Sequence, residues 1–376
     1  MIGQELHMNK GNKMLSYANP ILFISPLPPP QGGIAMWTKI LVDMGLPNNI
    51  PISIVDTKIR GNRNVFDHVF ISFSELSRTI RIWGSLIYQL VFKKPKLMHL
   101  NCSLSATGIF RDLSCAVLSR LFQIPVVSHY HGNVPDFCGK RFYGLSKIAL
   151  RILISIVAIN IVENKPSLET VKLLPLRKDT TIVLLPNFIE DKIFNYNVKV
   201  NNDGNRLRAL FAGGITRAKG CAEIIAVAKQ LPVIDFHLFG KMHNDMVTLF
   251  KNPPANIILH GVVDHDVLLK EMCISDFLLF PSYTEGFPLT VLEAMTVGIP
   301  VIATWVGALP EMIDEGLGGF LVAPQDVSNL VSAITKLISS TPCKLAMGQY
   351  NKQKSFNHYR YSTVISRLLA IYQQIL

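Results

Sequence analysis

Short apolar segments alternate with segments of helical periodicity along almost the whole chain, and this alternation constrains the fold more than any other feature. Apolar residues that recur every three to four positions indicate helices, and short apolar runs between them indicate strands. Strands that alternate with helices form βαβ units and parallel sheets, so the expected class is α/β. The expected strands are 21–25, 52–56, 97–100, 126–130 and 181–185, then 209–212, 235–239, 257–260, 277–280, 301–303 and 319–322.

The chain is too long for one ordinary core. At 376 residues, two domains are the natural expectation. Pro186-Asn187 has the composition of an exit turn, and the polar segment 195–206 is the best linker candidate. We therefore expect a first domain at 1–190 and a second at 206–355.

Charge and composition narrow the classes of partner. The formal net charge is +11, which favours an anionic partner. Lys and Arg are scattered through the first half without a dense block or a nucleic-acid motif, so an anionic membrane surface is favoured over nucleic acid. A plain solvated surface is the alternative.

The chain has no apolar run of the length that spans a bilayer. The nearest, 148–162, is short and contains Arg151, and it fits a buried helix followed by a strand. Without a signal-type apolar core near Met1, a cytoplasmic protein is expected. The six cysteines form no CxxC pair and predict reduced core thiols.

Two carboxylates, Glu285 and Glu293, stand eight residues apart around the turn Gly286-Phe287-Pro288. The turn joins an expected strand to a helix that starts near Leu289, at the strand end where open α/β sheets bind ligands. Acidic residues can simply complement a helix dipole, but Glu293 lies too far into the helix for that. A carboxylate between Leu292 and Ala294 needs a partner, and a ribose diol supplies two hydroxyl donors.

Each half of the chain has a glycine pair after its first expected strand. Gly213-Gly214 is followed by Arg217 and Lys219, which predicts a loop that holds a diphosphate; a flexible surface loop is the alternative. Gly32-Gly33 has the same position in the first half and predicts space for a substrate. Because the G-x-G-x-x-G fingerprint is absent, no dinucleotide cofactor is expected.

His129 and His131 end another first-half strand, and strand alternation places both on one face. His131, next to Gly132, is the stronger functional candidate. A metal pair is an alternative, but no carboxylate cluster is near in sequence, so no metal is expected. The triplet Asp264-His265-Asp266 resembles a D-x-D metal motif, yet its position favours a helix N-cap.

These motifs together resemble the GT-B-fold glycosyltransferases of the large retaining family 4, which includes sucrose synthase-like and polysaccharide-assembly enzymes. The resemblance is strong for 205–325 and looser before 190. It rests on the E-x7-E pair with PSYTEGFP at 281–288, EAM at 293–295, GIPVIA at 298–303 and GALPE at 307–311, and also on His131-Gly132, Pro186-Asn187 and a terminal helix ending at Ile371-Tyr372.

The resemblance implies two Rossmann-like parallel-sheet domains facing a central cleft, with the acceptor on the first domain and a nucleotide sugar on the second. It implies that helix 356–376 packs back on the first domain. Glu285, His131 and Lys219 would be catalytic, and Glu293 would bind the donor ribose. Gly32, Gly33, Gly213, Arg217, Gly286, Phe287, Pro288 and Leu289 would complete the donor site. The chain departs from the family at Gly214, where an Arg is usual, and Arg217 is the candidate replacement.

The implied reaction moves a hexose from a nucleoside diphosphate sugar, with a UDP-sugar as the expected donor, to a lipid-linked or oligosaccharide acceptor with retention. The implied role is bacterial-type surface polysaccharide or lipopolysaccharide assembly, without metal or cofactor, by a peripheral protein on the inner face of the cytoplasmic membrane. Two alternatives remain open: a GT-B nucleotide-sugar epimerase, and a non-catalytic sugar-nucleotide-binding subunit of a membrane complex.

Overall fold

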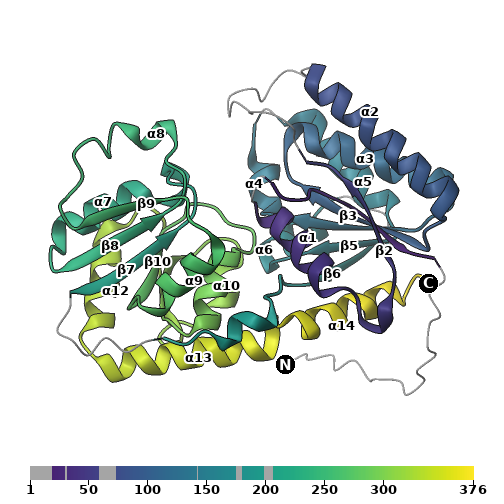
Figure 1. The fold of residues 1–376 in the computed structure, drawn as a ribbon. Helices are drawn as coiled ribbons and strands as arrows, with labels where there is room; N and C mark the ends of the chain where they lie inside the picture. Colours follow the sequence, from purple (N-terminus) through teal and green to yellow (C-terminus); the bar gives the residue numbers. More distant parts are fainter. Residues whose placement is uncertain (1–18, 30–31, 59–72, 142, 175–179, 199–205) are drawn as a thin grey trace.

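The computed structural model describes residues 19–29, 32–58, 73–141, 143–174, 180–198 and 206–376. These residues form two six-stranded parallel sheets, one in each half of the chain, with helices on both faces of each sheet (Figure 1). The α/β class and the two-domain arrangement expected from the sequence are confirmed.

The first sheet has the strand order β2-β1-β3-β4-β5-β6. Buried parallel strands are continuous apolar runs, so their positions are predicted well from the sequence. Two strands run further than expected, because Ser103 pairs with His131 at their ends. The strands are β1 Ile21–Ser25, β2 Ile52–Asp56, β3 Leu97–Ser103, β4 Val126–His131, β5 Ile159–Val162 and β6 Thr181–Leu184.

Helices cover the two faces of this sheet. One face carries α1 (Gly33–Met44) and the C-terminal helix α14 (Tyr361–Tyr372), whose Leu368 and Tyr372 share a core with Trp37. The opposite face carries three helices that pack side by side, with α3 against α2 and α5. They are α2 Phe73–Tyr88, extended by the π-helix η2 Gln89–Lys93, α3 Ala106–Leu121 and α5 Gly144–Ile156. The short helices α4 Val134–Gly139 and α6 Lys165–Lys172 follow β4 and β5.

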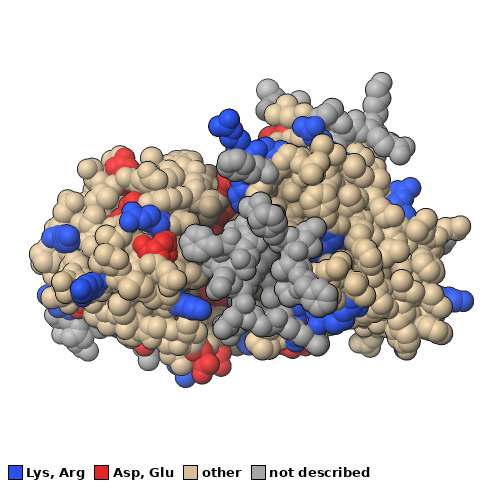
Figure 2. All heavy atoms as spheres, turned by 90° about the horizontal axis from the view of Figure 1, so that it is seen from above, with Lys and Arg blue, Asp and Glu red and all other residues tan. Residues whose placement is uncertain are grey.

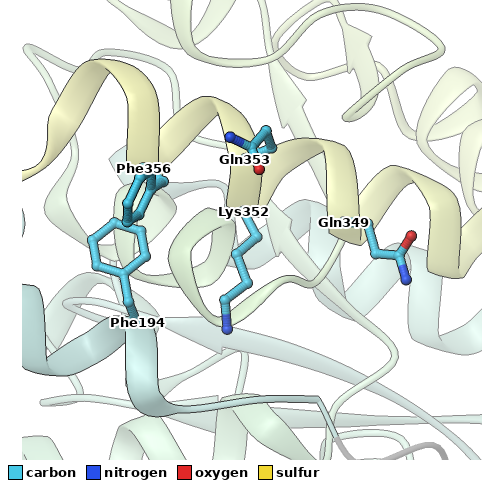
Figure 3. A pocket seen from close by; sticks show the side chains of 5 residues that line it. All are labelled: Phe194, Gln349, Lys352, Gln353 and Phe356. Carbon is cyan, nitrogen blue, oxygen red and sulfur yellow. The ribbon is translucent and has the colours of Figure 1, made fainter.

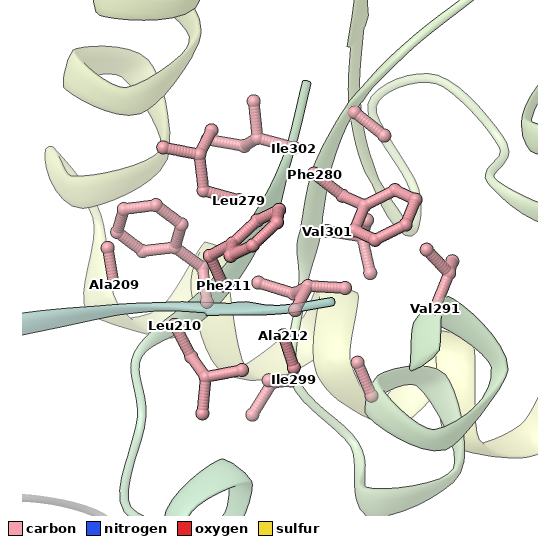
Figure 4. Packing of buried hydrophobic residues seen from close by; sticks show 14 of the residues in the cluster. Ala209, Leu210, Phe211, Ala212, Leu279, Phe280, Val291, Ile299, Val301 and Ile302 are labelled. Atoms are coloured by element: carbon pink, nitrogen blue, oxygen red, sulfur yellow. The ribbon is translucent and has the colours of Figure 1, made fainter. Parts of the chain in front are cut away.

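The second sheet has the order β12-β11-β10-β7-β8-β9, and its central strands are buried on both faces (Figure 4). Its strands are β7 Leu207–Ala212, β8 Ile234–Phe239, β9 Ile257–Gly261, β10 Phe277–Phe280, β11 Val301–Thr304 and β12 Gly319–Val322. Its helices are α7 Cys221–Gln230, α8 Asn244–Val247, α9 His265–Cys273, α10 Leu289–Val297, α11 Leu309–Met312, α12 Val327–Ile338 and α13 Thr341–Tyr359, with the 3-10 turn η4 Arg217–Lys219 before α7.

The chain crosses between the domains twice, and the two crossings lie together. The Ile189 N–H donates to the Tyr359 carbonyl over 2.8 Å, and the Tyr361 N–H donates to the Ile189 carbonyl over 3.0 Å. Arg360 also pairs with Asp191 over 2.9 Å. The return crossing is therefore at Arg360, between α13 on the second domain and α14 on the first. The sequence-based boundary at 356 falls inside α13, and most of the expected linker, 199–205, lies outside the described residues.

The structure also bears on the expected membrane spans, cysteines and N-cap residue. Within the described residues, no helix is both long and apolar enough to cross a membrane. All six cysteines are free, but Cys343 is exposed, so the expectation that all are core thiols is wrong for that residue. Asp264 is the N-cap residue of α9, as expected, although its side chain makes no capping hydrogen bond.

Candidate active site

The E-x7-E turn lies at the carboxyl end of β10, the central strand beside β7. Glu285 and Glu293 are both 8% exposed, so each carboxylate needs partners within the fold. α10 has Pro288 as its N-cap residue and no side-chain capping hydrogen bond, so its first backbone N–H groups are not satisfied by a cap. The turn therefore presents one buried carboxylate and a free helix N-terminus at the same place.

Lys219 reaches Glu285 from the glycine loop that follows β7. Its Nζ donates to Glu285 Oε1 over 2.6 Å, and the lysine side chain is 33% exposed. The loop lies close because Gly220 adopts a φ of +73° and its Cα faces the Pro281 carbonyl; a Cβ there would be 2.0 Å from that oxygen. The two predicted catalytic residues of the second domain are therefore in direct contact.

Glu293 has a partner that the sequence analysis did not anticipate. The His265 ring at the start of α9 lies 2.7 Å from Glu293 Oε1. This hydrogen bond is the main cause that raises the pKa of His265, against the opposing effect of burial. The triplet Asp264-His265-Asp266 contains this partner, but its spacing indicates a role only for the two carboxylates and not for the histidine between them.

The first domain touches this turn directly. A Cβ on Gly286 would lie 2.6 Å from the Cα of Gly132, the residue after His131. Asn164 Nδ2 donates to the Gly286 carbonyl over 3.2 Å, and Asn187 Nδ2 donates to the Phe287 carbonyl over 3.1 Å. The two domains are therefore in contact where the motifs of each half end, and Asn164 and Asn187 are site residues that spacing alone did not reveal.

His131 is held by two acceptors within the first domain. Its Nδ1 lies 2.7 Å from Glu163 Oε1 at the end of β5, and its Nε2 lies 2.8 Å from Asn101 Oδ1 in β3. The Asn101 amide nitrogen donates to Ser25 Oγ, which fixes Oδ1 as the acceptor. Both ring nitrogens are thus engaged, and the structure does not present a free one toward the second domain.

The same network extends to the C-terminal helix. Asn101 Oδ1 also lies 3.0 Å from His99 Nε2, and the Tyr372 hydroxyl of α14 lies 2.7 Å from His99 Nδ1. Burial, with a smaller effect of nearby His131, lowers the pKa of His99 to about 3, so this ring is neutral. A continuous chain of hydrogen bonds therefore links α14 to His131.

His129 stands apart from the network although it is fully buried. Neither of its ring nitrogens has a hydrogen-bond partner, and burial, with nearby His131, lowers its pKa well below the usual value. Its donor atoms and those of His131 and Glu163 lie within 4.8 Å of one another, a donor set that suits a metal such as zinc. The 2.7 Å between His131 and Glu163 is, however, a hydrogen-bond distance, shorter than the roughly 3.3 Å between two ligands of one zinc ion with bonds near 2 Å. His131 and Glu163 are therefore hydrogen-bonded to each other, and His129 lies beside them without a hydrogen bond.

The remaining predicted donor-site residues lie at the ends of β7 and β1. The backbone N–H of Arg217 donates to Asp245 over 2.8 Å, and the Arg217 side chain is exposed. The Gly213 N–H donates to the carbonyl of Phe239 at the end of β8. Gly32 and Gly33 begin α1, where an added Cβ would meet nothing within 4 Å.

The turn residues Phe287 and Leu289 pack inward. The Phe287 ring contacts Tyr359 in the second-domain core with ring centroids 5.4 Å apart, and Leu289 packs against the same core. Pro288 is the N-cap of α10. Phe287 therefore anchors the turn through its side chain, and only its backbone is available to a ligand.

A separate hollow lies on the second domain at α13. Figure 3 shows Phe194, Lys352 and Phe356 around it, and its volume is about 460 Å³. The Lys352 Nζ donates to the Tyr196 carbonyl over 2.7 Å, and the rings of Phe194 and Phe356 pack edge to face. None of the predicted site residues lines this hollow, so we treat it as separate from the candidate active site.

Comparisons with known proteins find a family match in the second half of the chain. Residues 193–354 match the family model described as glycosyl transferases group 1. An uncharacterized 41.2 kDa protein in the cps region of Klebsiella pneumoniae is 35% identical over 128 residues, 34% of this chain and 35% of that protein. Sulfoquinovosyl transferase SQD2 of Arabidopsis thaliana is 25% identical over 306 residues, 75% of this chain and 58% of that protein. The chain thus spans about a third to three-fifths of the curated relatives it matches.

Solved structures extend the likeness to the whole fold. Sucrose-phosphate synthase from Thermosynechococcus elongatus superposes with a TM-score of 0.76 at 19% identity, over 95% of this chain and 99% of that one. Anabaena HepE in complex with UDP-glucose gives a TM-score of 0.71 at 15% identity, over 95% and 100%. The chain therefore has the two-domain GT-B fold, and its second half, residues 193–354, matches the glycosyl transferases group 1 family.

Proposed function

We propose that the protein is a glycosyltransferase that moves a hexose from a nucleoside diphosphate sugar to a lipid-linked or oligosaccharide acceptor, with retention of configuration. The observation that carries the proposal is the Lys219–Glu285 contact beside the uncapped N-terminus of α10, opposite Gly132 of the first domain. Helix N-termini and lysine stabilise phosphate groups. The match of 193–354 to group 1 transferases and the UDP-glucose complex of a protein with this fold support the same reading, with a UDP-sugar as the first donor to test.

In this proposal the second domain stabilises the leaving group. The bond between the sugar C1 and the phosphate oxygen breaks, and its electron pair stays on the departing nucleoside diphosphate. Lys219, Arg217 and the N–H groups of α10 would offset the charge that develops there. The acceptor oxygen then bonds to C1, and its proton moves to the departing phosphate oxygen.

Each carboxylate has a distinct part. Glu285 holds Lys219 in position with one oxygen and leaves the other for a sugar hydroxyl. Glu293, with His265 on one oxygen, binds the ribose through the other. On the first domain, Glu163 and Asn101 fix the His131 ring at the junction between the domains, where a donor sugar would meet the acceptor. Contact of the two domains excludes water from the reacting carbon and limits hydrolysis.

The proposed setting is bacterial-type surface polysaccharide or lipopolysaccharide assembly, at the inner face of the cytoplasmic membrane. It draws support from the Klebsiella relative in the cps region. Two other readings have distinct signatures. A nucleotide-sugar epimerase would release epimerised sugar nucleotide without any acceptor. A non-catalytic subunit would bind the nucleotide sugar and transfer nothing; Gly214, in place of the usual Arg, is the feature that favours it.

A panel of UDP-, GDP- and ADP-sugars tests the proposal, first by thermal shift and then by transfer to polyprenyl-linked and oligosaccharide acceptors. A donor that binds only the native state raises the melting temperature by mass action. Glu285→Ala and Lys219→Ala are expected to abolish transfer. The matched control is the pair Lys172→Ala and Glu169→Ala, whose 3.0 Å ion pair on α6 is exposed to solvent. Transfer at the wild-type rate in both site variants would refute the site assignment.

A further inference from the structure

The outer side of α2, α3 and α5 is unusually rich in exposed apolar side chains. These helices cover one face of the first sheet and lie together at the top of the first domain (Figure 1). Of the 27 exposed large hydrophobic side chains among the described residues, 13 lie between Leu76 and Ile152. We call this surface the α2–α3–α5 face. Large contiguous apolar patches on the surface of a domain mark interaction sites.

The exposed side chains follow the helical period, so each helix presents an apolar stripe in one direction. Residues seven apart lie about two turns apart on the same side of a helix. Each helix also buries a different stripe against the sheet, as Leu86 does in α2 and Leu150 does in α5. The outer stripes are therefore additional to the core-facing ones. The exposed pairs at this spacing are Ile80 and Ile87, Phe110 and Val117, and Leu145 and Ile152.

The charge on the same segment is mainly positive. Residues 73–156 contain eleven Lys and Arg and three carboxylates, Glu75, Asp112 and Asp136. Asp112 is fully buried and paired with Arg111, and Asp136 hydrogen-bonds to Thr284 of the second domain. Seen from above, the right half of the molecule, which carries α2, is mostly uncharged surface with blue Lys and Arg groups and little red (Figure 2).

We propose that the α2–α3–α5 face docks on the surface of an anionic lipid bilayer. Apolar side chains insert into the boundary between head groups and acyl chains, while Lys and Arg pair with anionic head groups. A second copy of the chain fits less well. In a two-fold dimer this face would meet itself, which would oppose two surfaces of the same positive charge.

The docking surface and His131 belong to the same domain. Along the chain, the short helix α4 lies between His131, at the end of β4, and Leu145, at the start of α5. Docking through this face would hold the first domain, and with it His131, at the bilayer, where a lipid-linked acceptor resides. The bilayer contact itself does not depend on the sugar transfer proposed above, and each can fail without the other.

The first experiment removes apolar side chains that touch little else. Phe92, Leu121 and Leu145 are 70%, 73% and 74% exposed, so Ser at all three should leave the fold intact. The matched control places Ser at Leu173, Val233 and Val262, which are 85%, 62% and 70% exposed on other surfaces. Binding is measured by co-sedimentation with vesicles of phosphatidylcholine containing about 30 mol% phosphatidylglycerol, as an anionic leaflet. We expect the face variant to bind at least about tenfold more weakly than the control.

The second experiment tests charge. Lys93→Glu, Lys147→Glu and Arg151→Glu reverse three charges on the face, and each lost contact with an anionic surface is expected to weaken binding by about fivefold. Lys172→Glu, Lys229→Glu and Lys251→Glu are the control. Wild-type binding should fall with added salt and vanish on vesicles of phosphatidylcholine alone.

Several outcomes would overturn the proposal. They are a wild-type protein that does not bind the anionic vesicles, face variants that bind as the controls do, or a wild-type dimer by light scattering that the face variants convert to monomers without any vesicle binding. Transfer to a soluble oligosaccharide acceptor is measured in parallel. The face variants should retain that activity, so failure of docking is distinguished from failure of the proposed reaction.

Discussion

Gly286→Ala is expected to separate the two domains while leaving each domain folded. The added Cβ would lie 2.6 Å from the Gly132 Cα and 2.9 Å from its nitrogen, and both are backbone atoms that cannot rotate away. Ordinary contact begins near 3.4 Å, so the shortfall is about 0.8 Å. All three of the nearest atoms belong to Gly132 of the first domain, so the overlap is relieved if the interface opens.

Opening would strain the hydrogen bonds across the interface. They include Asn164 to the Gly286 carbonyl, Asn187 to the Phe287 carbonyl, the Lys165 N–H to Glu311 over 2.6 Å, and the Thr284 hydroxyl to Asp136. If two are lost at about 1 kcal/mol each, the closed arrangement is disfavoured by about 2 kcal/mol, or roughly 30-fold in population. We expect kcat for transfer to fall by about that factor, because transfer needs both domains.

Binding of the nucleoside diphosphate should change little, since its proposed contacts belong to the second domain. Small-angle X-ray scattering should report a larger radius of gyration for Gly286→Ala than for wild type. Gly139→Ala is the matched control: it lies in α4 of the first domain, and its Cβ would meet nothing within 4 Å. Transfer by Gly286→Ala within about threefold of wild type, together with identical scattering, would refute this prediction.

Three further predictions concern stability. Because the folded protein raises the pKa of His265, the protonated ring stabilises the fold below the unfolded pKa, and this effect is lost as pH rises through the folded pKa. The melting temperature of wild type should therefore exceed that of His265→Gln more at pH 6 than at pH 9; an equal difference at both pH values would contradict this. Tyr372→Phe removes the hydroxyl that hydrogen-bonds to His99 Nδ1 and should lower the free energy of unfolding in urea by about 1–3 kcal/mol. An unchanged free energy of unfolding would show that this hydrogen bond is dispensable. Gly240→Ala would place a Cβ 1.8 Å from the Gly213 carbonyl oxygen and should unfold the second domain. Gly84→Ala in α2, where the Cβ meets nothing within 4 Å, should instead stabilise the protein by about 0.5–1 kcal/mol, and similar melting curves for the two variants would contradict this.

The strands could be predicted almost completely because both sheets are parallel and buried. Such strands appear as continuous apolar runs, and glycine or proline marks their ends. The segment 148–162 also behaves as expected, as the end of α5 followed by β5. The return crossing at Arg360 could not be read from the pattern, because α13 and α14 are both helical and only their packing partners differ.

Part of the site was predictable for a topological reason. Lys219 follows β7 and Glu285 follows β10, and neighbouring parallel strands place their carboxyl ends together. The His131 network was not predictable, because Asn101 and Glu163 come from β3 and β5 and only the strand order brings them together. Phe287 was expected among the donor-site residues; its ring packs against Tyr359 in the core, so its proposed role there rests on the backbone.

The most direct test of the account is acceptor-dependent release of the nucleoside diphosphate from the stabilising sugar nucleotide. We expect wild type to release it only when an acceptor is present, and Glu285→Ala and Lys219→Ala to release essentially none while retaining their folds by circular dichroism. Release at the wild-type rate by both variants would contradict the role given to the Lys219–Glu285 contact. Epimerised sugar nucleotide formed without an acceptor would contradict the proposed transfer itself.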